Sequence, residues 1–118
     1  MRAYSSAKIL GAFIQNTLVA YAVFLTNTSP KVEHRACLFS LYTNENYRNQ
    51  GIADSLVKAV IADLKPDIHQ LHLSVITSNQ SAIHLYEKNG FKSYGIEPRS
   101  FKIDEQFYDE QLLVLMFK

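Results

Sequence analysis

Residues 34–76 constrain the fold of this chain more than any other segment. A mostly apolar run predicts a strand over 34–43, and a polar loop leads from it toward a helix. Apolar residues recur at helical spacing over 52–64, and Pro66 ends that helix. Alternating apolar residues then predict another strand over 71–76. A strand, a helix and a strand in this order indicate a parallel pair with a right-handed crossover.

Antiparallel strands are predicted on both sides of this unit, because apolar runs there are separated by short polar turns. The predicted order is strand, strand, strand, helix, strand, helix, strand, strand. This order is an α/β fold with a mixed sheet, in a single domain over 1–118. The other predicted elements are strands over 8–14, 18–25, 91–103 and 108–117, turns at 15–16, 27–31 and 104–106, and a short helix between signals at 77–79 and 89–90.

Composition excludes several classes of function. The chain has 118 residues, of which 47% are hydrophobic, and its formal net charge is +1. The basic residues form no runs, so we expect no nucleic-acid partner. No apolar run approaches the ~20 residues of a membrane span, and residues 1–6 lack a signal-peptide layout. Cys37 is the only cysteine, which we expect to be a small buried side chain in a reducing, cytoplasmic setting.

The start of the first helix is the sharpest candidate site. A helix N-terminus presents unpaired N–H groups and the positive end of its dipole, which suit a phosphate or pyrophosphate. Gly51 lets a ligand approach the backbone, Ala53 is nearly as small, and Arg48 adds a positive charge. A tight structural turn is the alternative interpretation, and the glycine patterns of nucleotide-phosphate loops and dinucleotide sites are absent.

Two motifs together resemble a known family. Arg48-x-x-Gly51-x-Ala53, which opens a helix after a strand, resembles motif A of the GNAT superfamily of acyl-CoA N-acyltransferases. The segment from Asn79 to Phe91, with Ala82, Tyr86 and Gly90 inside it, resembles motif B of that superfamily. The ending from Glu97 to Met116 is also similar, so the resemblance covers about residues 8–117. It implies a GNAT-like fold and acetyl-CoA as the cofactor.

The resemblance also implies roles for individual residues. Backbone N–H groups from Asn49 to Ala53, with the Ser55 hydroxyl, hold the CoA pyrophosphate. The strand end over 41–43 pairs with the pantetheine arm, which Asn79 hydrogen-bonds, and Ala82 packs beside it. The expected cofactor-binding residues are Leu41, Tyr42, Thr43, Arg48, Asn49, Gln50, Gly51, Ile52, Ala53, Ser55, Asn79, Ala82 and Tyr86.

Tyr86 is the expected catalytic residue, because the resemblance places it near the cofactor sulfur, where it can protonate the leaving thiolate. Without the resemblance, Tyr86 is a core aromatic residue and Asn79 is an ordinary helix N-cap. His84 lies on another face of the helix and is expected at the surface. No histidine has metal-ligand spacing with Cys37, so no metal is predicted.

Two departures from the family affect the acceptor side. Many members carry a glutamate on the strand before motif A as the general base, but residues 35–42 contain no acid. Glu33, Glu45, Asp109 or a tyrosine acting through water remain as candidates. Members also usually begin with a strand and two helices that wall the acceptor site, whereas seven residues precede Lys8 here. The chain is then a naturally short version, a fragment, or a subunit whose partner supplies the missing wall. We expect a shortened fold whose exposed surface favours a homodimer.

Three functions remain open from the sequence. The leading hypothesis is transfer of an acetyl group from acetyl-CoA to a primary amine of a small-molecule or peptide acceptor. The second is a CoA-binding remnant with little catalysis. The third is a small interaction module in which the turn at Gly51 is only structural.

Overall fold

The computed structural model describes residues 6–27, 29–64, 66 and 68–117. Residues 1–5, where no signal-peptide layout is predicted, and residue 28 of the predicted turn 27–31 lie outside the described residues. All eight predicted elements are present in the predicted order, and a short 3-10 helix is added in the polar loop. The elements are β1 (Ser6–Ile14), β2 (Thr17–Thr26), β3 (Arg35–Thr43), η1 (Glu45–Tyr47), α1 (Ile52–Leu64), β4 (Gln70–Ile76), α2 (Gln80–Lys88), β5 (Lys92–Ile103) and β6 (Gln106–Met116).

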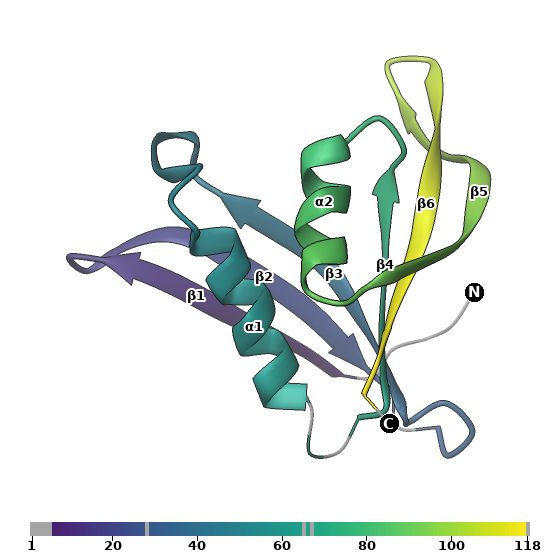
Figure 1. The fold of residues 1–118 in the computed structure, drawn as a ribbon, viewed down its shortest axis with the longest axis horizontal. Coiled ribbons are helices and arrows are strands. Elements are labelled where there is room, and N and C mark those ends of the chain that lie inside the picture. The colour runs from purple at the N-terminus through teal and green to yellow at the C-terminus, as the bar shows by residue number, and fades with distance from the viewer. Residues whose placement is uncertain (1–5, 28, 65, 67, 118) are drawn as a thin grey trace.

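One mixed sheet organises the molecule, in the order β1-β2-β3-β4-β6-β5 (Figure 1). The parallel pair predicted around the first helix is β3 with β4, and the other neighbouring strands are antiparallel. The last strand, β6, lies between β4 and β5 rather than at the edge. The mixed α/β fold predicted from the sequence is confirmed.

Both hairpins close on two-residue turns whose residues have positive φ. Gln15 and Asn16 have φ of 49° and 67°, and Asp104 and Glu105 have φ of 47° and 68°. Positive φ at both central residues is the type I′ geometry, whose twist matches that of the strands it joins. The predicted C-terminal turn over 104–106 was therefore one residue too long, and β6 begins at Gln106 rather than at 108.

Both helices cover the same face of the sheet, and they lie in front of it in Figure 1. The predicted apolar face of α1 is confirmed, because Val57 and Val60 are fully buried. Ile83 and Tyr86 of α2 join the same core cluster as Phe24 of β2. Among the described residues, no helix is long and apolar enough to cross a bilayer.

The strand β3 differs from the buried central strand expected from its composition. Its neighbour β2 pairs Val23 with Ser40 and Phe24 with Leu38, so Phe39 is an extra, bulged residue. The Phe39 side chain is 70% exposed. Cys37, expected to be buried, is only half-buried. A bulge reverses which side chains face the core, so Leu41 packs against the core beyond it.

Candidate functional site

A pocket of about 580 Å³ opens between β3, α1, β4 and α2. Its origin is the divergence of β3 from β4, which Figure 1 shows as two arrows that spread apart toward their ends. The two strands pair only from Arg35–Cys37 to Gln70–His72, and beyond that point β4 continues its pairing with β6. The predicted site residues that line the pocket are Leu41, Tyr42, Thr43, Arg48, Asn49, Gly51, Ile52, Ala53, Asn79, Ala82 and Tyr86.

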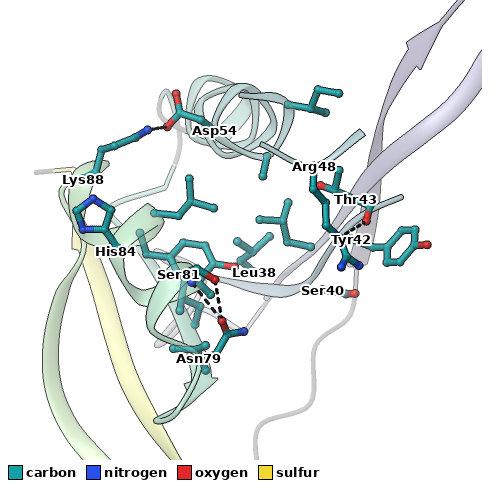
Figure 2. Close-up of a pocket in the computed structure, with 18 of the residues that line it drawn as sticks. Leu38, Ser40, Tyr42, Thr43, Arg48, Asp54, Asn79, Ser81, His84 and Lys88 are labelled. Atoms are coloured by element: carbon teal, nitrogen blue, oxygen red, sulfur yellow. Dashed lines mark hydrogen bonds and ion pairs between the residues drawn. The ribbon is translucent and has the colours of Figure 1, made fainter. Parts of the chain in front are cut away.

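The end of β3 presents a strand edge to this pocket. Its other edge is paired with β2 as far as Thr43, which lies opposite Ala20. A strand edge carries backbone N–H and C=O groups that pair with an extended chain of polar groups. The edge over 41–43 therefore has the geometry expected for pairing with an amide-containing arm. The ring of Tyr42 points away from the pocket in Figure 2 and lies 5.5 Å from the ring of Tyr21, so Tyr42 contributes backbone rather than side chain.

The start of α1 forms the second wall. Asn49 and Gly51 have φ of 64° and 78°, which is the left-handed region that asparagine and glycine adopt most readily. The N–H groups of the first helical turn have no partner within the helix, and the first helical bond here runs from Ser55 N to Gly51 O. A Cβ placed on Gly51 meets no atom within 4 Å. Glycine is therefore needed for backbone conformation, and the space beside it is open to a ligand.

Arg48 links these first two walls. Its Nε donates to the Thr43 carbonyl oxygen at 3.2 Å, and Figure 2 shows both residues on one side of the pocket. The side chain is exposed. The bond fixes the end of β3 against the loop that leads into α1, and it brings a positive charge to the pocket rim.

Asn79 is the N-cap of α2, as one of the two interpretations of this residue expected. Its Oδ1 accepts from Ala82 N at 3.3 Å and from the Ser81 hydroxyl at 3.2 Å. The cap uses only the oxygen of the amide, so the amide NH₂ group is the part that can donate to a ligand. Capping and ligand binding are compatible roles for this residue.

Tyr86 is 8% exposed and packs edge-on against Phe91, with ring centroids 5.6 Å apart. Burial raises the pKa of the Tyr86 hydroxyl to about 12, because the charged phenolate loses its hydration. The group is therefore protonated throughout the neutral range. Tyr86 is both a core aromatic residue and a lining residue of the pocket.

Two of the predicted cofactor-binding residues do not line the pocket. Gln50 and Ser55 are exposed and lie outside the lining set. The Ser55 N–H is already used in the first helical hydrogen bond. Ser55 lies outside the apolar positions of α1, so its exposure agrees with the helical pattern.

The pocket lining also includes side chains that the sequence analysis did not assign to the site, among them Tyr47, Asp54, His84 and Lys88. His84 is exposed, as expected, yet it borders the pocket rather than the general surface. The spacing of the lining residues of α2 at 81, 84, 85 and 88 is the i, i+3, i+4, i+7 pattern of one helix face. That pattern was the signal available in the sequence.

The three acidic candidates for the general base are not among the lining residues, whereas the tyrosines Tyr42, Tyr47 and Tyr86 are. Glu33 borders a second cavity of about 440 Å³, together with Asn27 and His69. Asp109 accepts through Oδ1 from the Arg99 N–H at 2.9 Å, and Glu45 is exposed in η1. Within the described residues, no group of three or more His, Cys, Asp or Glu side chains is arranged to hold a metal ion.

The family model described as "Acetyltransferase (GNAT) family" matches residues 1–91. The chain belongs to the GNAT acetyltransferase family. Two curated acetyltransferases match in sequence. An N-alpha-acetyltransferase of Saccharolobus solfataricus is 37% identical over 65 residues, which are 53% of this chain and 39% of that protein. A spermidine N(1)-acetyltransferase of Vibrio cholerae is 25% identical over 85 residues, 70% of this chain and 49% of that protein. The chain thus spans at most half of the curated relatives it matches.

Solved GNAT structures agree with the fold. An acetyltransferase of the GNAT family from Streptococcus pneumoniae superimposes with a TM-score of 0.87 at 28% identity, covering 93% of this chain and 66% of that one. The ribosomal-protein-S18-alanine N-acetyltransferase of Escherichia coli gives 0.84 at 24% identity, with 95% and 70% covered. The second likeness supports the fold alone.

Proposed function

We propose that this GNAT chain transfers an acetyl group from acetyl-CoA to a primary amine by direct attack of the amine on the thioester. One observation carries the proposal. A single pocket brings together the left-handed turn at Gly51, the edge of β3 over 41–43 and the α2 face that carries Asn79 and Tyr86. The turn at Gly51 suits a pyrophosphate, the β3 edge suits an amide-containing arm, and the α2 face suits a thioester.

The chemistry divides among these three walls. N–H groups at the start of α1 bind the pyrophosphate through their partial positive charges. The edge of β3 pairs with the pantetheine amides, and an N–H group there stabilises the negative charge that develops on the thioester oxygen. The neutral amine attacks the carbonyl carbon, the C–S bond breaks and the sulfur leaves as a thiolate. The nitrogen loses one proton as the amide forms, and the thiolate gains one to give the CoA thiol.

Tyr86 acts as the hydrogen-bond donor to this sulfur. With a pKa of about 12 for the phenol and about 8.5 for a thiol, full proton transfer is uphill by roughly 3–4 units. With the ordinary tyrosine pKa of about 10, the same transfer would be uphill by only roughly 1–2 units. Donation of a hydrogen bond during C–S cleavage needs no complete transfer, and a protonated Tyr86 at neutral pH supplies it.

The acceptor is an amine, for which the relatives suggest two classes. One curated relative is named for N-alpha-acetylation and the other for spermidine. Two acids of β6, Asp109 and Glu110, have the charge that would attract a cationic amine. Their oxygens accept from Arg99 N and the Ser100 hydroxyl, which supports a structural role in the β5 bulge instead.

A thiol-release assay tests the transfer. Acetyl-CoA is incubated with the protein and, separately, with a polyamine, a peptide with a free N-terminus, or a peptide whose only amine is a lysine side chain. Amine-dependent release of CoA, with acetylated product by mass spectrometry, is the expected result. Binding of acetyl-CoA without release for any amine would instead favour the CoA-binding remnant. Absence of binding would favour the interaction module.

One observation favours the alternative of a CoA-binding remnant with little catalysis. Asp54 is the sole carboxylate side chain that lines the described pocket, and it is paired with Lys58 and Lys88. No acid in the pocket lining is thereby positioned as an obvious base for the amine, whose deprotonation at pH 7 costs about 4–5 kcal/mol for a lysine-like group.

We also propose that the protein forms a homodimer through the sheet face that the helices leave uncovered. Both helices cover one face, while Ile9, 69% exposed, lies opposite Val23 on the other. Large apolar side chains left exposed on a sheet face favour association. Sedimentation at micromolar concentration tests the proposal: a dimer is expected for the wild type and a monomer for Ile9→Glu, whereas a monomeric wild type contradicts it.

A further inference from the structure

The start of α1 and the end of α2 are joined by a polar contact that the proposed chemistry does not use. Asn89 Nδ2 donates to Asp54 Oδ1 at 2.8 Å, and Lys88 Nζ lies 3.5 Å from the same oxygen. Figure 2 shows Lys88 reaching from α2 to Asp54 along one side of the pocket. The contact therefore joins two walls of the pocket directly.

On the α2 side, this contact leads to Tyr86. Asn89 is the C-cap of α2, and its Nδ2 also donates to the Leu85 carbonyl at 3.0 Å. The backbone N–H groups of Asn89 and Phe91 both donate to the Tyr86 carbonyl, at 3.0 and 3.1 Å. Asp54 thus holds the helical turn from which the Tyr86 side chain projects.

On the α1 side, Asp54 follows Ala53 in the first helical turn, next to the proposed pyrophosphate site. Lys58 also binds its carboxylate, one turn further along the helix. Hydrogen bonds from Lys58 and then Asn89 lower the pKa of Asp54 to about 2, so the side chain is a carboxylate throughout the neutral range. An acidic side chain in the first helical turn interacts favourably with the helix dipole, but beside the proposed pyrophosphate site it also repels an anionic ligand.

We propose that Asp54 is a positioning residue that fixes the α2 turn carrying Tyr86 relative to the start of α1. The inference rests on the proposed function, since it assumes that one cofactor spans both helices. Asp54 does not contact the reacting atoms. It sets the distance between the N–H groups of α1 that bind the pyrophosphate and the residues of α2 that contact the pantetheine arm and the thioester.

The direction in which Asp54→Ala changes ligand affinity distinguishes a positioning role from a purely electrostatic effect. Asp54→Ala removes a negative charge beside an anion site, so without a positioning role both acetyl-CoA and its nucleotide half, 3′-phospho-ADP, bind more tightly. With a positioning role, acetyl-CoA binds about 5–10-fold more weakly, while the nucleotide half, which needs only α1, changes by less than about twofold. Equal weakening of both ligands indicates general damage and overturns the proposal.

Two variants complete the test. Asp54→Asn keeps an oxygen that can accept from Asn89, so acetyl-CoA affinity stays close to or above that of the wild type. Asp63→Ala is the matched control, because Asp63 lies on the same helix but pairs with Lys8 of β1 at 3.2 Å. It leaves both affinities unchanged. A loss in Asp63→Ala equal to that in Asp54→Ala contradicts a specific role for Asp54.

Hydrogen exchange distinguishes failure of this inference from failure of the proposed function. Asp54→Ala accelerates exchange of the Asn89 and Phe91 amides, and Asp63→Ala does not, whether or not acetyl-CoA binds. If the wild type fails to bind acetyl-CoA, the proposed function is wrong. Exchange of the Asn89 and Phe91 amides still tests the contact between the helices in that case. Unchanged exchange in Asp54→Ala overturns the positioning role in either case.

Discussion

Arg48 Nε donates to the carbonyl oxygen of Thr43 at 3.2 Å, which ties the last residue of β3 to the loop before α1. These two segments form adjacent walls of the pocket. The backbone edge at the end of β3 and the N–H groups of α1 are thereby held in one orientation before any ligand arrives. Such preorganisation reduces the ordering cost of binding an extended cofactor.

Replacement of Arg48 should weaken cofactor binding. Arg48→Ala removes both the tie to Thr43 and a positive charge at the rim, so we expect acetyl-CoA to bind about 3–10-fold more weakly, a modest loss because the side chain is exposed. Arg48→Lys keeps the charge but not the planar guanidinium donor, and an intermediate affinity is expected. Isothermal titration at two salt concentrations measures both effects. Wild-type affinity in both variants contradicts a role for Arg48.

Gly51→Ala should damage binding more than folding. The φ of 78° at Gly51 costs an alanine about 1–2 kcal/mol of folding free energy. The added methyl also stands where the pyrophosphate approaches, so acetyl-CoA affinity should fall at least about tenfold, or 1.4 kcal/mol. Gly95→Ala is the control, because its Cβ makes an ordinary contact 3.9 Å from Leu112 Cδ1. Should the folded Gly51→Ala protein bind acetyl-CoA like Gly95→Ala, the anion site lies elsewhere.

Tyr86→Phe should lower turnover and leave the acetyl-CoA dissociation constant nearly unchanged. The variant keeps the aromatic packing against Phe91 and removes only the hydroxyl that donates to the sulfur. Acid catalysis contributes about 10²–10⁴-fold, and the high pKa of Tyr86 favours the lower end, so kcat should fall about 10²-fold. Steady-state kinetics with the best amine, alongside titration calorimetry, gives both numbers. Equal kcat in the two proteins removes Tyr86 from this role.

The burial of Tyr86 also predicts a dependence of stability on alkaline pH. Its pKa is raised from 10.0 to about 12, so the folded state favours the neutral phenol. This contribution is complete below pH 10 and is lost as the pH rises through 12. At pH 11 the wild type should have lost about 1 kcal/mol of unfolding free energy relative to Tyr86→Phe. Urea titrations of both proteins at pH 8 and pH 11 measure the difference, and a constant difference contradicts it.

The helices and strands were predictable from local patterns in the sequence, but the irregular pairing of β3 with β2 was not. The spacing of Val57 and Val60 predicts which face of α1 is buried, and Asn79 predicts where α2 begins. Both predictions are possible because helix amphipathicity and N-capping depend on residues close together in the sequence. The bulge at Phe39 depends on the register with β2. An apolar run predicts a buried strand whether or not it contains a bulge, so the exposure of Phe39 was not predictable.

The site shows the same division. Motif residues such as Gly51 and Tyr86 carry local signals, and they do line one pocket. The Asp54–Asn89 contact joins residues 35 positions apart, and no local sequence pattern at either residue predicts the pairing. Side-chain contacts between distant elements arise from tertiary packing, which a single sequence does not specify position by position.

Titration of acetyl-CoA into the wild-type protein is the decisive measurement for the proposed cofactor site. We expect saturable binding of one acetyl-CoA per chain, with a dissociation constant on the order of 1–100 µM, within the usual range of enzyme KM values. We also expect 3′-phospho-ADP to compete for the same site. If a folded protein shows no detectable binding at millimolar acetyl-CoA, the pocket is not a CoA site.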